Sequence, residues 1–466
     1  MRILLPAYFL LFVLFACNKK SDSNKDVYFG GVVINPYDEW VYLFEGEKVI
    51  DSVSLNEDNT FMFHFKEIPM GLYRFVVKPE YQYVFFEPGD SLMVYLNTLD
   101  FDESLVFSGD GNEKNNFLSE IFLQNEKETD KIISFYQLSA HDFVRKMDSL
   151  RTIKMVELSK LKSEIAISER FEKVAIGSIN FINFRARELY PFINATHIET
   201  GSLNLPKSYY DFRKEVSMDD TIFMSYYSYK KYLVSYLNNV SYFKCLADCK
   251  SQPISSKFSV HHNLHKLSLI DSLVINPAIK DMLLQDSAVS FLINEEDSSS
   301  LSVFISKFDK IVRNQRIKKE IDVLAENVSR ISKGSNLPEI WVVNAKGESI
   351  NLTQVLKGHE AVICFWDSNL IGHFKNEHEK IATFKQDYPK IKFIAISTST
   401  NHEQWLGEIS DNRLDVNTEF RALDFKKLSE DLVIKNITKT FLINADGTIK
   451  DSSLNFFDPA FETFLK

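Results

Sequence analysis

The run AVICFW, at residues 361–366, constrains the fold more than any other stretch of the chain, because all six of its side chains are apolar. A strand covered on both faces of its sheet needs such a continuous run, whereas a strand with one solvent face alternates. The amphipathic stretch FKNEHEKIATFKQDYP follows shortly after, and IKFIAIS supplies a second apolar strand. This region therefore predicts a buried mixed sheet covered by helices.

Phrases on either side extend this pattern over residues 333–466. WVVNAKGESINL has the form of a β-hairpin about residues 344–347, and TFLINADGTIK has the form of a second hairpin about residues 444–447. Short helices are expected at TQVLKG and NHEQWLGEI. The predicted order of elements is ββ-α-β-α-β-α-ββ-α, which describes an α/β domain.

The rest of the chain has two other patterns. Residues 27–111 alternate apolar and polar side chains in short runs between NP, DN, MG and PGD turns, which predicts a small β-sandwich-like domain. Residues 112–332 carry apolar side chains at steps of three and four, which predicts a helical middle region without a clear repeat. We therefore expect a multidomain α+β protein, since 466 residues exceed one ordinary core.

The N-terminus indicates where the protein lives. The apolar run LLPAYFLLFVLFA ends at Cys17 and is too short to span a bilayer, which is typical of a signal peptide. Its last residues, LFAC, resemble the bacterial lipobox, in which cleavage leaves a lipid-bearing cysteine. We expect residues 1–17 to be a lipoprotein signal ending in lipidated Cys17, and residues 18–26 to be a polar tether. The alternative is an ordinary secretory signal or membrane anchor.

This assignment predicts a location in the cell envelope. A lipid at Cys17 would anchor the chain to a membrane, facing either the periplasm or the cell surface. The membrane is then one partner of the protein, through the lipid.

Charge and motif content exclude several function classes. The 54 basic and 64 acidic residues give a formal net charge of −10, so no basic surplus is available to neutralise the phosphates of a nucleic acid. The sequence contains no GxSxG, P-loop, HExxH or GxGxxG phrase. We expect no nucleic-acid partner and no cofactor.

The four cysteines do not form an obvious disulfide framework. With Cys17 lipidated, an odd number remains for an oxidising compartment. Cys245 and Cys249 lie one helical turn apart, where a strained disulfide is possible. Cys364 lies within AVICFW and is expected to be a buried strand residue.

The C-terminal region resembles the thioredoxin fold, and specifically the membrane-associated thiol-disulfide oxidoreductases of the TlpA/ResA type. The resemblance extends from about residue 336 to the C-terminus. The matching residues, in chain order, are Pro338, Gly347, Leu352, Gly358, Phe365, Trp366, Trp405 and the phrase TFLINADG. Their order and spacing together carry the resemblance, which implies a thioredoxin-like domain over residues 333–466.

The residues that perform redox chemistry in that family are replaced here. The family reads F-W-A-x-W-C-x-x-C, and in the same register this chain has Leu370 and His373 at the two cysteine positions. The family's helix-kinking proline aligns with His378, and its cis-proline aligns with Thr438, where we expect a trans bond. Dithiol exchange needs a thiolate and a second thiol. We therefore expect a redox-inactive domain with no catalytic residues.

One His–Glu pair and one His–His pair raise the question of a metal. His373 and Glu377 share a helical face with Asp367 nearby, and His261 and His265 are spaced one turn apart in HHNLH. Two ligands at this spacing are common by chance, so we expect no metal at either place. His261 and His265 are expected on a solvated helix surface.

The sequence supports a binding role for the altered domain. Thioredoxin folds bind extended peptides beside the loop that carries the cis-proline position, through contacts that need no sulfur. The predicted groove is lined by Trp366, Leu370, Ile371 and Thr438. Its partner is expected to be a protein or peptide of the cell envelope, whose identity the sequence does not give.

Two alternatives remain open. The chain could be a TlpA-like thiol-disulfide oxidoreductase of envelope redox homeostasis that uses Cys245 and Cys249. Alternatively, the β-rich domain and the helical middle region carry the biological role, and the C-terminal domain is structural.

Overall fold

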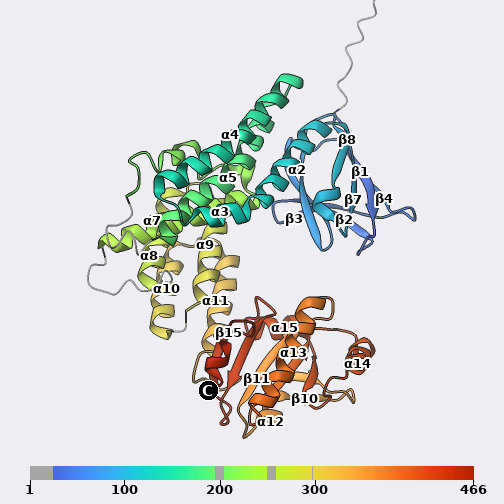
Figure 1. The fold of residues 1–466 in the computed structure, drawn as a ribbon, viewed down its shortest axis with the longest axis vertical. Coiled ribbons are helices and arrows are strands. Elements are labelled where there is room, and N and C mark those ends of the chain that lie inside the picture. Colours follow the sequence, from blue (N-terminus) through green and yellow to red (C-terminus); the bar gives the residue numbers. More distant parts are fainter. Residues whose placement is uncertain (1–24, 195–203, 249–258, 296) are drawn as a thin grey trace, which may run out of the picture. The chain divides into compact units, whose positions relative to one another are not determined.

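The computed structural model describes residues 25–194, 204–248, 259–295 and 297–466, and within them the chain is mixed α and β (Figure 1). It divides into two compact units, Met1–Ser235 and Tyr236–Lys466, and each is described by itself. The domain boundaries expected from the sequence stay a prediction. No helix in the described part of the chain is both long and apolar enough to cross a membrane.

The first unit begins with two four-stranded sheets. One has the strand order β4-β1-β7-β8 and the other has the order β3-β2-β5-β6. The strands are β1 (Val27–Ile34), β2 (Trp40–Glu45), β3 (Lys48–Ser54), β4 (Thr60–Phe65), β5 (Gly71–Val77), β6 (Glu80–Phe86), β7 (Ser91–Asn97) and β8 (Val106–Asp110). Side chains from both sheets share one apolar core, so the two sheets form a sandwich.

Strict alternation along the strands explains this core. In β4, Phe61 and Phe63 are buried while Met62 and His64 point outward. Successive side chains of a strand point to opposite faces, so alternating apolar residues build one buried face per sheet. The sandwich expected from the alternating runs is therefore present.

Helices follow the sandwich in the first unit. They are α1 (Phe101–Ser104), α2 (Asn112–Lys127), α3 (Thr129–Phe135), α4 (Ala140–Glu164), α5 (Glu169–Ile193), the 3-10 turns η1 (Asp211–Glu215) and η2 (Thr221–Phe223), and α7 (Tyr227–Asp248), which runs on into the second unit. On α2, the amide of Asn115 accepts from Phe85 N at 2.7 Å and donates to Phe85 O at 3.0 Å. Because β6 is an edge strand, this contact satisfies backbone groups that no neighbouring strand can reach.

The second unit contains four further helices ahead of its sheet. They are α8 (Val260–Leu273), α9 (Pro277–Leu292), α10 (Ser298–Ile311) and α11 (Gln315–Arg330). Each begins at a residue whose side chain accepts a hydrogen bond from the backbone of the first turn, namely Ser259, Asn276, Asp297 and Asn314. Such caps satisfy donors that a helix start leaves free, and they fix where each helix begins.

A seven-stranded mixed sheet forms the C-terminal part, with the strand order β10-β9-β13-β12-β11-β14-β15. Its elements are β9 (Trp341–Val343), β10 (Ser349–Asn351), α12 (Leu352–Leu356), β11 (Ala361–Trp366), α13 (Ile371–Asp387), β12 (Lys392–Ser397), α14 (His402–Asp411), β13 (Glu419–Ala422), α15 (Phe425–Asp431), β14 (Lys439–Ile443), β15 (Ile449–Asn455) and η3 (Phe461–Phe464). Strands β11, β12 and β13 run parallel, and the remaining pairs are antiparallel.

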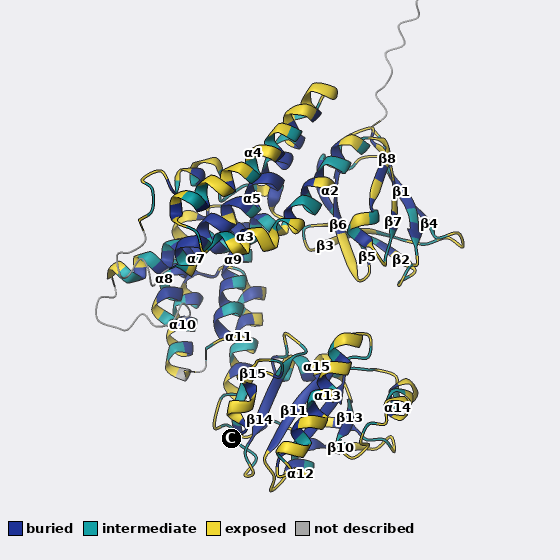
Figure 2. Cartoon of the chain, in the orientation of Figure 1, coloured by how far each residue is buried: buried dark blue, intermediate teal, exposed yellow. Residues whose placement is uncertain are grey.

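This arrangement is a thioredoxin-like fold. The β11–α13–β12 unit lies at the centre of the sheet, and the β14–β15 hairpin lies beside β11. Every residue of β11 is buried, as its apolar run predicted, and Figure 2 shows the central strands in dark blue. The sequence-based order was wrong at one place, because it lacked β13 and α15 between α14 and the final hairpin.

Candidate functional site

Leu370 and His373, the two positions singled out in the sequence, lie where β11 runs into α13. Leu370 is the N-cap residue of α13 and His373 belongs to its first turn. The connection is ordered by Asp367, whose backbone oxygen accepts from Leu370 N at 3.1 Å and whose carboxylate accepts from Thr398 Oγ1 at 2.8 Å. Both residues therefore lie at the junction between strand and helix. That they take the two cysteine positions of the resembled family stays a prediction.

The four predicted groove residues differ in accessibility. Leu370 is 48% exposed and Ile371 is 62% exposed, whereas Trp366 is completely buried. The peptide bond before Thr438 is trans, its N–H donates to Asn436 Oδ1 at 3.1 Å, and its carbonyl accepts from Phe456 N at 3.2 Å. Two of the four residues thus present a surface, while Trp366 and the backbone of Thr438 are engaged inside the domain.

A set of buried and half-buried polar side chains, the acid–imidazole cluster, includes residues from the first turns of α13. It consists of His373, Glu377 and His378 on α13 and Glu419 on β13. His373 Nε2 lies 3.1 Å from Glu377 Oε2, and His378 Nε2 lies 3.3 Å from Glu419 Oε1. Burial of two carboxyl groups in one place is unusual, because charged side chains are almost never fully buried unless paired.

Helical spacing brings Glu377 into the core. The buried face of α13 comprises Phe374, Glu377, Ile381 and Phe384, which follow one another at steps of three and four. Glu377 therefore takes a position that the amphipathic pattern would give to an apolar residue. Its side chain is only 1% exposed.

The sheet supplies the floor of the cluster. Cys364 on β11 lies opposite Ala395 on β12, which lies opposite Glu419 on β13, so these three side chains form one row across the sheet. The small side chain of Ala395 separates the thiol from the carboxylate. Glu419 Oε2 accepts a hydrogen bond from Trp366 Nε1 at 3.0 Å, which explains how a buried indole N–H is satisfied.

Several atoms of the cluster have no hydrogen-bond partner. They are both ring nitrogens of His373, Oε1 of Glu377 and Nε2 of His378. The close approaches of imidazole to carboxylate are ion-pair distances whose angles do not fit a hydrogen bond. A buried polar atom left unsatisfied costs about 1–3 kcal/mol, so this part of the domain is not optimised for stability.

The surroundings of Glu377 and His373 favour the uncharged form of each. Burial raises the pKa of Glu377 well above its ordinary value, and the neighbouring Glu419 raises it further. Burial also lowers the pKa of His373, and nearby His378 adds to this, while Asp367 opposes it. The arrangement can hold a proton on a buried carboxyl group beside a neutral imidazole, but it contains no nucleophile for thiol exchange.

The thiol of Cys364 is not a substitute nucleophile. It is buried on β11 as expected, and burial raises its pKa well above the ordinary value, with Glu377 and Glu419 adding to the effect. The reactive form of cysteine is the thiolate, which this environment disfavours. Cys364 is therefore held as an inert thiol.

The remaining sequence candidates are dispersed. Cys245 is buried on α7, and its proposed disulfide partner Cys249 lies outside the described residues, as does Cys17. His261 is exposed on α8, and His265 is half-buried one turn later. Within the described ranges, no three or more His, Cys, Asp or Glu side chains are arranged to hold a metal ion.

Sequence reasoning missed Glu419 and the core position of Glu377. The second had a visible signal, because Glu377 interrupts the apolar stripe of α13. The first had none, because the four-residue strand EFRA lacks an apolar run.

Comparisons with known proteins found no matching protein-family model and no matching curated protein. Solved structures that it resembles include the thioredoxin domain of a thiol-disulfide oxidoreductase from Bacteroides vulgatus, with 21% identity, a TM-score of 0.25, and coverage of 29% of this chain and 99% of that one. Another is a thiol:disulfide interchange protein from Bacteroides sp., with 22% identity, a TM-score of 0.24, and coverage of 27% and 83%. The activities in these descriptions belong to those proteins.

Proposed function

We propose that this chain is a lipid-anchored protein of the bacterial cell envelope whose C-terminal thioredoxin-like domain binds a partner protein or peptide without exchanging thiols. The observation that carries the proposal is the first turn of α13. The apolar side chains of Leu370 and Ile371 face solvent there. In the register of the resembled family, Leu370 and His373 take the two positions at which dithiol chemistry needs cysteines.

The surroundings of the described cysteines support the loss of thiol chemistry. Cys364 and Cys245 are both buried, which removes their thiols from large disulfide substrates. The oxidoreductase alternative needs Cys249 together with Cys245. Burial of Cys245 weighs against that alternative, so we retain the binding function.

The binding surface is narrower than the groove expected from the sequence. Thr438 uses both backbone groups within the domain, so a partner cannot add to them as a further strand. Contact is instead made by side chains at the start of α13. Gly372 adds to this surface, since a side chain at its position would meet open space.

Thiol chemistry is tested by the reduction of insulin by dithiothreitol. The wild-type chain is expected to give no acceleration over the uncatalysed reaction, and Cys245→Ser should change nothing. The double variant Leu370→Cys/His373→Cys restores two thiols at the helix start and should form a disulfide between them. Acceleration by the wild-type chain that disappears in Cys245→Ser would overturn the proposal in favour of the oxidoreductase.

Binding is tested by placing a photo-crosslinking amino acid at Ile371 in the envelope of the native host. We expect one adduct, and Leu370→Asp should abolish it because a charge then enters an apolar contact. The same crosslinker at Lys390, an exposed residue of the same domain, is the matched control. Equal adducts at both positions, or none at Ile371, would count against binding at this surface.

Anchoring is tested separately by Cys17→Ser. Loss of the lipid should move the chain from the membrane fraction to the soluble periplasmic or external fraction, because a single short apolar run does not hold it. Retention in the membrane fraction would favour an ordinary membrane anchor.

A further inference from the structure

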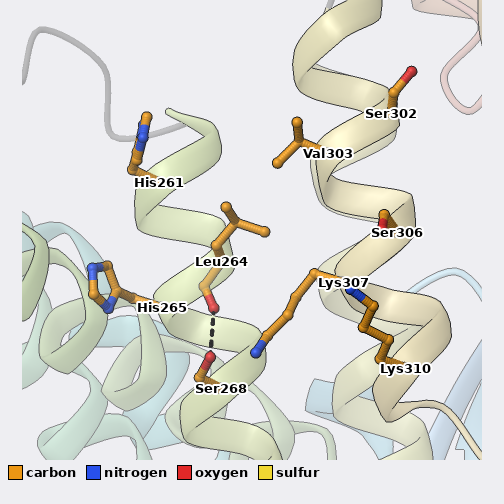
Figure 3. Close-up of a pocket in the computed structure, with 9 residues that line it drawn as sticks. All are labelled: His261, Leu264, His265, Ser268, Ser302, Val303, Ser306, Lys307 and Lys310. Carbon is orange, nitrogen blue, oxygen red and sulfur yellow. Dashed lines mark hydrogen bonds between the residues drawn. The ribbon is translucent and has the colours of Figure 1, made fainter.

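A hollow in the second unit lies between α8 and α10, far along the chain from the start of α13 (Figure 3). Its volume is about 600 Å³, within the range of roughly 300–1,000 Å³ that is typical of small-molecule sites. The residues that line it are His261, Leu264, His265, Ser268, Ser302, Val303, Ser306, Lys307 and Lys310.

The charged side chains that line this hollow are all basic. Its nine lining residues include two lysines and no aspartate or glutamate. In the described part of the chain, no carboxylate lies within ion-pair distance of Lys307 or Lys310. The acidic residue between them, Asp309, lies 3.2 Å from Lys318 instead. Two uncompensated cations side by side stand out in a chain whose formal net charge is −10.

Helix geometry places the two lysines together. Lys307 and Lys310 are three residues apart on α10, so their side chains share one face, and like charges at this spacing repel each other. Figure 3 shows Lys307 reaching from α10 towards Ser268 of α8, with Leu264 and Val303 above it in the gap between the helices. A bound anion would remove the repulsion and use both amines.

The neutral side chains indicate what kind of anion fits. Ser268 donates its hydroxyl to Leu264 O at 3.0 Å, so this hydroxyl is engaged within α8. Ser306 lies one residue before Lys307 on α10, and it also lines the hollow. Leu264 of α8 and Val303 of α10 add apolar side chains to the same hollow. The hollow therefore combines a cationic end with a non-polar side, and it is larger than an inorganic ion needs.

We propose that this hollow binds a small organic phosphate, with the phosphate group held by Lys307, Lys310 and Ser306 and the organic part resting against Leu264 and Val303. A phosphate group has several acceptor oxygens and takes donors from different directions, and lysine binds it as a point charge. The same chemistry is offered by a soluble phosphate ester and by a phospholipid headgroup. This inference is independent of the function proposed for the start of α13.

The test is calorimetric titration of the full chain with glycerol 3-phosphate at constant ionic strength, alongside co-sedimentation with vesicles of phosphatidylglycerol in phosphatidylcholine. We expect glycerol 3-phosphate to bind, and Lys307→Gln and Lys310→Gln each to weaken binding about tenfold. The matched control is Lys319→Gln, which removes the same charge from an exposed position on α11 outside the hollow. Val303→Glu, at an exposed position, introduces a carboxylate and should abolish binding.

The two probes and the hollow variants distinguish a soluble ligand from a phospholipid headgroup. Binding of the soluble ester that is lost in the hollow variants alone supports a soluble ligand. Vesicle binding lost in the same variants, without binding of the soluble ester, supports a headgroup. Equal weakening in Lys319→Gln, or no binding of either phosphate probe, would overturn the proposal. Circular dichroism and the melting temperature establish that each variant is folded.

Discussion

The interior of the N-terminal sandwich and the interior of the C-terminal domain are built on different principles. In the sandwich, Phe29 packs against other phenylalanine rings at centroid distances of 5.3–6.0 Å, in a core of apolar side chains. In the C-terminal domain, the core around Trp366 contains Glu377 and Glu419, and some of the polar atoms there have no partner.

The difference between the two cores indicates that stability was not the only requirement in the core of the C-terminal domain. An apolar core follows the general rules of folding, whereas buried acids with unsatisfied atoms violate them. Proteins tend to break such rules at functional or strained sites, and this violation includes His373 in the first turn of α13. The comparison therefore predicts a large loss of stability for a substitution in the sandwich core. It predicts a smaller loss, or a gain, for substitutions among the buried acids of the C-terminal core.

The largest effect is expected for Phe29→Ala in the sandwich. Removing a fully buried ring leaves a cavity, and the free energy of unfolding should fall by about 3–5 kcal/mol. Chemical denaturation followed by circular dichroism measures it. Tyr95→Ala, at a half-exposed position of the same sheet, is the control and should change stability by less than about 0.5 kcal/mol. Similar losses at both positions would show that this core is loosely packed.

An intermediate effect is expected for Glu419→Ala in the acid–imidazole cluster. The indole N–H of Trp366 loses its acceptor and stays buried, which should cost about 1–3 kcal/mol of unfolding free energy. Glu419→Gln keeps an acceptor oxygen and should cost less. The same denaturation experiment, read by tryptophan fluorescence, measures both variants. If Gln and Ala cost the same, shape rather than the hydrogen bond is what Glu419 contributes.

A smaller effect, with the opposite sign, is expected for Glu377→Gln. Because the folded protein raises the pKa of Glu377 above its ordinary value of 4.5, folding favours the protonated form. Its contribution to stability is complete below pH 4.5 and is lost as pH rises towards the raised pKa. The glutamine variant cannot ionise, so its melting temperature should gain on that of the wild type as pH rises from 4.5 to 8.

Two controls sharpen this prediction. Glu379→Gln changes an exposed residue of the same helix and should leave the pH profile unaltered. His373 acts in the other direction, because its lowered pKa makes the protein lose stability as pH falls below its ordinary value of 6.5. A Glu377→Gln profile parallel to that of the wild type across the whole range would mean that Glu377 is not buried in solution.

The sequence predicted the parts of this fold that are fixed by periodic apolar patterns. The run AVICFW gave β11, and the amphipathic stretch after it gave α13, although the helix begins three residues earlier than the pattern indicated. Strand β13 escaped because four residues are too few to show a period, and because Glu419 and Arg421 make it look like a loop. Its place in the sheet depends on pairing with β12 and β9, which are remote in sequence.

The candidate site was predicted in outline only. The resemblance led us to expect Leu370 and His373 where the strand runs into the helix, but it did not indicate that Trp366 is buried. The alternation of side chains along a strand could have indicated this burial. Trp366 is two residues from Cys364, so both lie on the face of β11 that packs under α13. Contacts of Glu419 with Trp366 and His378 join residues that are 53 and 41 positions apart in the sequence, and no local pattern encodes them.

The smallest effect on stability is expected for Leu370→Ser and Ile371→Ser, at the surface above the cluster. Both side chains are about half exposed or more, so each substitution should change the free energy of unfolding by less than about 0.5 kcal/mol. The crosslinked partner adduct should nevertheless disappear, because the apolar contact that the partner buries is removed. A stability loss comparable to that of Phe29→Ala would show that these residues are part of the core. Unchanged stability with an unchanged adduct would instead place the partner's contact elsewhere, and unchanged stability without the adduct is what a surface retained for binding requires.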